Sequence, residues 1–285
     1  MSIARAPSTS LRDKIRRRGY WEFIIRPVSF VEARVSTLDD LALLVARERV
    51  RAGGRLYPQI NYPGAPNPGI DWVEQGVDRE WRIEYWRFYK SGLFYYTLAM
   101  YEDYWQNTGL PWPPQESDWR RRSFLDPGEA VATLSAIYEF AARLAQSAAG
   151  DASMHLEIKL GNLDCGGRAL RSARDQRNFP DEHKALEPRF SRNEDLRQAE
   201  LIGGTRDLAL QAVRDLFRLF AWAPSDGAFA SDAGSSRTLT PWRRPRRPHS
   251  AAAGAVPLTS PPPPGPPAWR RCRSGTSAGR CCATG

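Results

Sequence analysis

The sequence EWRIEYWRFYKSGLFYYTLAMYED, residues 80–103, decides the fold. Two runs rich in aromatic and β-branched residues flank the tripeptide 90–92, and such residues suit a pleated, partly buried surface. Gly92 tolerates the positive φ angle that a tight turn requires. The stretch therefore predicts a β-hairpin at the centre of a sheet. An amphipathic helix is the alternative, because three rings also have helical spacing: Trp81, Tyr85 and Phe88.

Both faces of this hairpin carry large rings, so each face is expected to pack against another part of the chain. The helix predicted at 127–147 is the natural cover for one face. Two loops rich in proline and aromatic residues, 57–69 and 108–122, are the expected cover for the other. On this interpretation the rings belong to the scaffold and do not form a binding platform.

Helices are predicted where apolar residues recur at helical spacing, at 37–50, 127–147 and 205–221. The second has the clearest start, because the N-cap acid Asp126 is followed by Pro127 and then by Glu129, three residues after the cap. Just before the hairpin, Ile70 to Val73 is expected to be a strand-like turn. Further strands are predicted at 19–27, 153–160, 168–171 and 196–202.

Residues 172–192 are polar and are expected to form an exposed connection. Strands interrupted by a few helices, without regular alternation, favour an antiparallel sheet over a parallel one. The sequence therefore predicts an α+β fold: a mainly antiparallel sheet of five to seven strands packed against about three helices, with a disordered C-terminal tail.

Charge divides the chain into three parts. The formal net charge is +9, but residues 226–285 contain nine Arg and two Asp, and residues 1–18 contain six basic groups and one Asp. The central segment is therefore close to neutral, so the overall charge does not by itself indicate nucleic-acid binding. We predict a basic flexible arm or short helix at 1–18, a single domain at 19–224 and a tail at 225–285.

The tail differs in composition from the rest of the chain. Ala, Pro, Arg, Gly, Ser and Thr fill 48 of the 60 positions in 226–285, which leaves too little apolar surface to offset chain entropy. We expect disorder there, and residues 261–264 are a candidate polyproline ligand. The chain has 37 Arg and four Lys, which suggests a GC-rich gene. The residues that fill the tail, above all Ala, Pro, Arg and Gly, are those that GC-rich codons encode. We therefore hypothesise that the tail is the translation of a wrong reading frame of such a gene.

Cysteine and hydropathy patterns exclude several classes of protein. Cys165 is the one cysteine outside the tail, and no spacing fits a zinc site or a disulfide framework. No run approaches 18 apolar residues, so no membrane span is expected. The N-terminus has charges but no apolar core of a signal peptide. We expect a cytoplasmic protein with no metal and no cofactor.

Two surfaces are candidates for binding. One is the basic arm, whose arginines are suited to phosphates or acidic lipid, although a solvated, fraying terminus is the interpretation we favour. The other is the loop 108–122, where rings lie beside arginines and are suited to stacking on bases or to an acidic partner. Tryptophans that only anchor this loop are the favoured alternative. The residues are Arg16, Arg17, Arg18, Trp112, Trp119, Arg120, Arg121 and Arg122.

No established catalytic motif is present in the sequence. His155 and Glu157 share one predicted strand face and form a candidate acid–base pair, but a solvated polar face explains them as well and is favoured. Glu84 and Glu139 lie among aromatic residues and are candidates for a shifted pKa. Pairing with an arginine such as Arg82, Arg87 or Arg143 is the favoured alternative.

Three segments together resemble a family of uncharacterised bacterial proteins: RGYWEFIIRPVSFVEARV at 18–35, WRIEYWRFYKSGLFYY at 81–96 and IYEFAARLA at 137–145. The resemblance spans roughly residues 12–223 and implies no known activity. We expect a non-enzymatic binding or sensor module with an unknown partner, which we suggest is a protein. One alternative is nucleic-acid binding through the basic arm and the loop 108–122, which we call the Trp/Arg loop. The other is an enzyme of unknown class.

Overall fold

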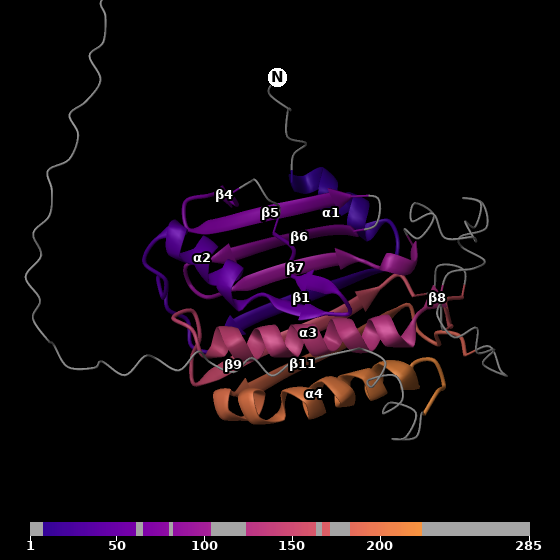
Figure 1. The fold of residues 1–285 in the computed structure, drawn as a ribbon. Coiled ribbons are helices and arrows are strands. Elements are labelled where there is room, and N and C mark those ends of the chain that lie inside the picture. The colour runs from indigo at the N-terminus through magenta and orange to yellow at the C-terminus, as the bar shows by residue number, and fades with distance from the viewer. Residues whose placement is uncertain are drawn as a thin grey trace, which may run out of the picture. The chain divides into compact units, whose positions relative to one another are not determined.

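The computed structural model describes residues 8–60, 65–79, 82–103, 124–163, 167–171 and 183–223. Its centre is a seven-stranded sheet in which every neighbouring pair is antiparallel, with the order β11-β9-β1-β7-β6-β5-β4 (Figure 1). The strands are β1 Tyr20–Pro27, β4 Asn67–Pro68, β5 Trp72–Arg79, β6 Arg82–Tyr89, β7 Phe94–Ala99, β9 Ser153–Gly161 and β11 Arg189–Arg197.

The helices are α1 Ser8–Arg16, α2 Leu38–Glu48, α3 Pro127–Ala145 and α4 Gln198–Arg218, with a 3-10 turn, η1, at Tyr101–Asp103. Two further pairs of short strands lie outside the main sheet: β2 Val50–Ala52 with β3 Arg55–Tyr57, and β8 Phe124–Leu125 with β10 Ala169–Leu170. Figure 1 shows α3 and α4 lying next to each other across one face of the sheet. The predicted α+β fold is confirmed.

The central hairpin is formed by β6 and β7, as predicted. Trp86 pairs with Tyr96 and Phe88 with Phe94 across the two strands. Gly92 has a φ of +89° in the turn, a conformation that glycine adopts without steric penalty. The amphipathic-helix alternative is therefore wrong for the described part of this stretch, which begins at Arg82.

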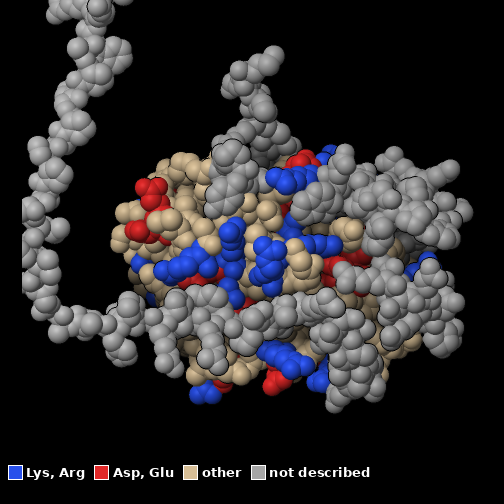
Figure 2. Space-filling view, in the orientation of Figure 1, with Lys and Arg blue, Asp and Glu red and all other residues tan. Residues whose placement is uncertain are grey.

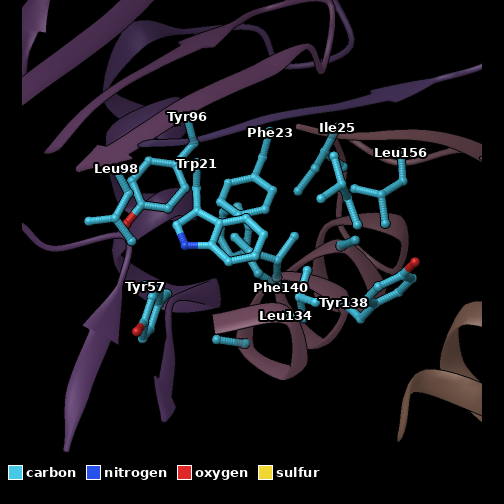
Figure 3. Close-up of a cluster of buried hydrophobic side chains, with 14 of the residues drawn as sticks. Trp21, Phe23, Ile25, Tyr57, Tyr96, Leu98, Leu134, Tyr138, Phe140 and Leu156 are labelled. Atoms are coloured by element: carbon cyan, nitrogen blue, oxygen red, sulfur yellow. The ribbon is translucent and has the colours of Figure 1, made fainter. Parts of the chain in front are cut away.

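One face of the sheet carries the main hydrophobic core. Alternate residues of β1 and β7, among them Trp21, Phe23 and Tyr96, pack against α3 residues such as Leu134 and Phe140 (Figure 3). The start of α3 is as predicted: the Asp126 side chain accepts a hydrogen bond from the backbone N–H of Glu129, and Pro127 occupies the first turn. Helix 127–147 was thus correctly predicted as the cover of one face.

The opposite face is covered in part by α1, which the sequence assigned to the basic arm. Ile15 is fully buried in a second cluster with Ile83, Tyr85 and Ala99, and Leu11 packs against this cluster. The start of the predicted covering loop, at Tyr57, belongs instead to the main core. The described start of this loop therefore packs on the other face from the one expected, whereas residues 61–64 and loop 108–122 lie outside the described residues.

The C-terminal strand and helix were predicted in kind, but with the wrong bounds. The strand predicted at 196–202 overlaps β11 only at Leu196 and Arg197, because β11 begins at Arg189 and α4 begins at Gln198. The helix predicted at 205–221 is α4, which starts seven residues earlier than expected. Two inward positions of β11, Phe190 and Leu196, pack on the main core, but the two between them, Arg192 and Glu194, are polar and hide the strand pattern. Arg192 pairs with Asp215 of α4, and Glu194 accepts a hydrogen bond from Tyr138 of α3. Burial of these groups depends on ion pairs that form only in the folded chain.

Two more differences concern short strands. The strand-like turn predicted at Ile70 to Val73 is the start of the eight-residue strand β5, whose polar residues mask the strand pattern. The loop predicted at 57–69 contains a short strand, because Asn67 and Pro68 pair with β5. Gly53 and Gly54 form the turn between β2 and β3, and both have positive φ angles.

Candidate functional site

A cavity of about 180 Å³ lies on the sheet face that α1 partly covers. Tyrosine and arginine side chains dominate its lining, and we call it the tyrosine–arginine pocket. It is lined by Arg12, Ile24, Tyr85, Arg87, Tyr89, Leu93 and Tyr95.

The strand alternation of the sequence builds this pocket. Successive side chains point to opposite faces of a sheet, so Tyr85, Arg87 and Tyr89 of β6 share the face opposite the main core. The register then places three of the lining residues in one row across adjacent strands, because Tyr95 pairs with Arg87 on one side and with Ile24 on the other. The sheet forms the floor, and α1 supplies Arg12.

Arg12 is the cation that completes the pocket. Its guanidinium carbon lies 4.9 Å from the ring centre of Tyr95 and 5.7 Å from that of Tyr85, within the range of cation–π attraction. One contact with a hydroxyl oxygen is long, at 3.4 Å from Nη2 to Tyr95. Its Nε is buried without a hydrogen-bond partner, and no ion pair of Arg12 occurs within the described ranges.

The other polar groups around the pocket are held in place. Glu74 accepts hydrogen bonds from the Tyr85 hydroxyl and from Nε and Nη2 of Arg87, the last two at 3.0 and 2.7 Å. Glu22 accepts one from the Tyr95 hydroxyl at 2.8 Å. Burial, and then the hydrogen bonds to these carboxylates, raise the pKa of both tyrosines. The two rings are therefore fixed and neutral, and their hydroxyls are already engaged.

The arginines predicted from the sequence as a basic arm do not gather at one place. Arg16 pairs with Glu22 at 2.6 Å, and this hydrogen bond raises the pKa of Arg16. Arg18 donates a hydrogen bond to the backbone oxygen of Asp103, which belongs to the 3-10 turn η1 that follows β7. Arg17 is exposed. The remaining predicted binding residues, Trp112, Trp119, Arg120, Arg121 and Arg122, lie outside the described residues.

Basic and acidic side chains are also mixed on the face that α3 and α4 cover. Figure 2 shows Lys and Arg side chains near the middle of this face with Asp and Glu side chains close by. Several arginines of α2, β3 and α3 form ion pairs: Arg47–Glu48, Arg55–Glu129 and Arg143–Glu139. Nearby carboxylates weaken the attraction of such a surface for a phosphate backbone.

Each candidate catalytic residue has a polar partner, and His155 and Glu157 share one face of β9. Glu84 binds Arg82; burial raises the pKa of Glu84, and Arg82 opposes this shift. Glu139 accepts a hydrogen bond from Arg143 at 2.8 Å. His155 contacts Asp195 on the neighbouring strand, at 2.6 Å. The favoured interpretation of Glu84 and Glu139, pairing with an arginine, is confirmed.

A smaller cavity of about 20 Å³ lies on the main-core side of the sheet, between β3, β6, η1 and α3. It contains the buried carboxyl group of Glu102, the last glutamate of the stretch that decides the fold. Burial raises the pKa of Glu102 to about 8. No cluster of three or more metal-binding side chains occurs in the described ranges, and no helix there is long and apolar enough to cross a membrane.

Neither Arg12 nor Glu102 was singled out from the sequence. The alternation of Tyr85, Arg87 and Tyr89 was visible, and it indicates that these three side chains share a face. Nothing in the sequence indicates that Arg12, 83 positions before Tyr95, joins them. Comparisons with known protein families, with curated proteins and with solved structures found no match to the chain.

Proposed function

We propose that this chain is a non-enzymatic binding or sensor module whose tyrosine–arginine pocket binds one planar ring that carries a negative charge. The observation that carries the proposal is the position of Arg12. Its guanidinium group lies beside two fixed rings, at the edge of a cavity. Its Nε has no hydrogen-bond partner, and no carboxylate pairs with Arg12 in the described ranges.

The size of the pocket supports a single-ring ligand. A cavity of about 150 Å³ in another protein is large enough to bind benzene, and this pocket measures about 180 Å³. Full-sized ligand sites usually exceed about 300 Å³, so a larger ligand would place only one ring here. Tyrosine rings pack against flat ligands in offset or edge-on geometry, which favours a planar ring over a bulky aliphatic one.

The charge of the pocket supports an anion. Arg87 is already neutralised by Glu74 and Arg16 by Glu22, whereas Arg12 forms no ion pair with any residue that the structure describes. A carboxylate or phosphate on the ring would accept hydrogen bonds from a planar guanidinium group, and such charge-assisted bonds are stronger than neutral ones. A cationic ligand would instead be repelled by Arg12.

We also propose that this module is a bacterial protein of the cytoplasm. The resemblance of residues 12–223 to uncharacterised bacterial proteins and the single cysteine before residue 226 support a bacterial, cytoplasmic protein. A protein partner that responds to the bound ligand fits a sensor role. Nucleic-acid binding through the arm and the Trp/Arg loop, and an enzyme of unknown class, stay as predictions from the sequence.

The proposal is tested by calorimetric titration of the full chain with three probes. Benzoate is planar and anionic, cyclohexanecarboxylate is anionic but not planar, and benzylammonium is planar but cationic. We expect benzoate to bind with a dissociation constant on the order of 1 mM. The other two should bind at least about tenfold more weakly, a difference of about 1.4 kcal/mol.

Two variants of α1 complete this test. Arg12→Gln should remove benzoate binding, whereas Lys14→Gln should preserve it. Lys14 belongs to the same helix and carries the same charge, but it pairs with Asp78 and does not line the pocket. Equal binding of benzoate and benzylammonium, or an unchanged affinity in Arg12→Gln, would show that the pocket does not select planar anions.

A further inference from the structure

The smaller cavity, on the opposite side of the sheet from the tyrosine–arginine pocket, contains several buried polar groups. Its volume of about 20 Å³ exceeds the roughly 10–15 Å³ that one water molecule requires. Polar residues from four elements line it: Tyr57 of β3, Arg82 of β6, Glu102 of η1 and Thr133 of α3. Arg55 and Glu129 also line it.

Both arginines of this cavity already have partners for their charge. Arg55 pairs with Glu129 at 2.6 Å and stacks 4.1 Å from the ring centre of Tyr101. Arg82 binds Glu84 and lies 4.7 Å from the ring centre of Tyr57. The rings are therefore covered by guanidinium groups from the chain itself, which leaves no aromatic face for an external cation.

Four polar side chains at the cavity have unused hydrogen-bonding capacity within the described ranges. Nη1 of Arg82 is buried without any hydrogen bond, and Arg82 is 4% exposed. Oε1 of Glu102 accepts a hydrogen bond from the backbone N–H of Asp126 at 2.9 Å, but no cation pairs with this carboxyl group. The hydroxyl oxygens of Tyr57 and Thr133 are 3.4 Å apart, which is long for a hydrogen bond.

We propose that this cavity is a hydration site in which one water molecule bridges Glu102 to Arg82 and Thr133. A buried polar group without a partner costs about 1–3 kcal/mol, and buried waters typically make about three hydrogen bonds to such groups. The water accepts from Nη1 of Arg82 and donates to Glu102 and to the Thr133 hydroxyl. It joins the buried Arg82–Glu84 pair of the sheet to the start of α3.

The water bridge also places the Glu102 carboxyl group in contact with a polar network that includes Arg82 and Thr133. Several charged groups face this carboxyl group: Asp126 and Glu129 from the start of α3, Arg55 from β3 and Arg82 from β6. Burial, with the two nearby carboxylates at the start of α3, raises the pKa of Glu102 to about 8. At neutral pH the group therefore carries a proton, which is released to solvent as pH rises.

A high-resolution crystal structure of the full chain tests the proposal. We expect one water peak about 2.7–3.2 Å from both Glu102 and Nη1 of Arg82. Thr133→Val removes one hydrogen-bonding group of the water at nearly constant volume and should empty the site, whereas Thr133→Ser keeps the hydroxyl and should retain the water. An empty cavity in the native protein would overturn the proposal.

A solution measurement keeps the test independent of crystals. The titration of the Glu102 side-chain carbon can be followed by NMR in the native protein and in both Thr133 variants. Loss of the water removes stabilisation of the carboxylate, so Thr133→Val should raise the pKa of Glu102 further, whereas Thr133→Ser should leave it unchanged. Identical titrations in all three proteins would contradict a bridging water.

Discussion

Gly76 of β5 provides the space in which Leu11 of α1 rests on the sheet. A Cβ atom built at Gly76 would lie 2.4 Å from Cδ2 of Leu11, closer than packed carbon atoms approach. Gly76 also pairs with Tyr85, a wall of the tyrosine–arginine pocket. A side chain at position 76 would therefore require Leu11, which holds α1 and with it Arg12 against the sheet, to move.

Gly76→Val should detach α1 while leaving the sheet intact. Valine is favourable in a strand, but its side chain would occupy the place of Leu11, and an isolated nine-residue helix is not stable in water. Hydrogen exchange of the α1 amides should become at least about tenfold faster, and benzoate binding should be lost. Retention of both in a folded Gly76→Val protein would show that α1 does not depend on this contact.

Gly203→Ala is a second glycine substitution, with the opposite expected result. Gly203 lies within α4 and is exposed, and a Cβ atom added there would meet nothing within 4 Å. Alanine should stabilise the protein by about 0.5–1 kcal/mol, because it restricts the unfolded chain and favours the helix. Urea unfolding of the two proteins measures this difference. A destabilised variant would mean that a side chain at position 203 clashes with another part of the chain.

Trp86→Ala should destabilise the fold strongly. Trp86 is fully buried, its ring stacks on Phe94, and its Nε1 donates to the backbone oxygen of Gln59 at 3.2 Å. Loss of this ring should lower the free energy of unfolding by about 3–5 kcal/mol in chemical denaturation. Phe30→Ala is the matched control: Phe30 is 82% exposed, and its loss should change stability by less than about 0.5 kcal/mol.

Glu102→Gln should change how stability depends on pH. The folded protein keeps the Glu102 proton up to its pKa of about 8, whereas the ordinary value is 4.5. Between these values unfolding releases a proton, so this group makes stability fall as pH rises, by up to about 1.4 kcal/mol per pH unit. The contribution is fully present below pH 4.5 and is lost as pH rises to about 8.

Glutamine has no such proton, so the stability of Glu102→Gln relative to the native protein should increase by about 3 kcal/mol from roughly pH 5 to pH 8. Denaturant unfolding of both proteins at several pH values measures the difference. Parallel stability curves over this range would mean that Glu102 ionises at an ordinary pH in the folded state.

The elements that were predicted correctly are those specified by local sequence. The start of α3 depends on Asp126, Pro127 and Glu129, which are close together in the chain. The central hairpin depends on aromatic alternation and on Gly92. These signals act over a few residues, so they do not require knowledge of the tertiary structure.

The elements that were missed depend on distant partners. Strand β11 has polar residues at most positions, and its half-buried residues Arg192 and Glu194 are satisfied by α4 and α3. The pocket likewise needs Arg12 to reach Tyr95, 83 positions later. A single sequence does not show such pairings, because a polar residue that will be buried and paired looks the same as one that stays in solvent.

The most direct test of the tyrosine–arginine pocket is an NMR titration of the full chain with benzoate, observing the tyrosine ring signals and the arginine Nε–H signals. We expect saturable shifts for Tyr85, Tyr89, Tyr95 and Arg12, with a midpoint on the order of 1 mM, and no such shifts with benzylammonium. Unchanged signals for these four residues, or equal shifts with both probes, would contradict the central claim that the pocket binds a planar anion.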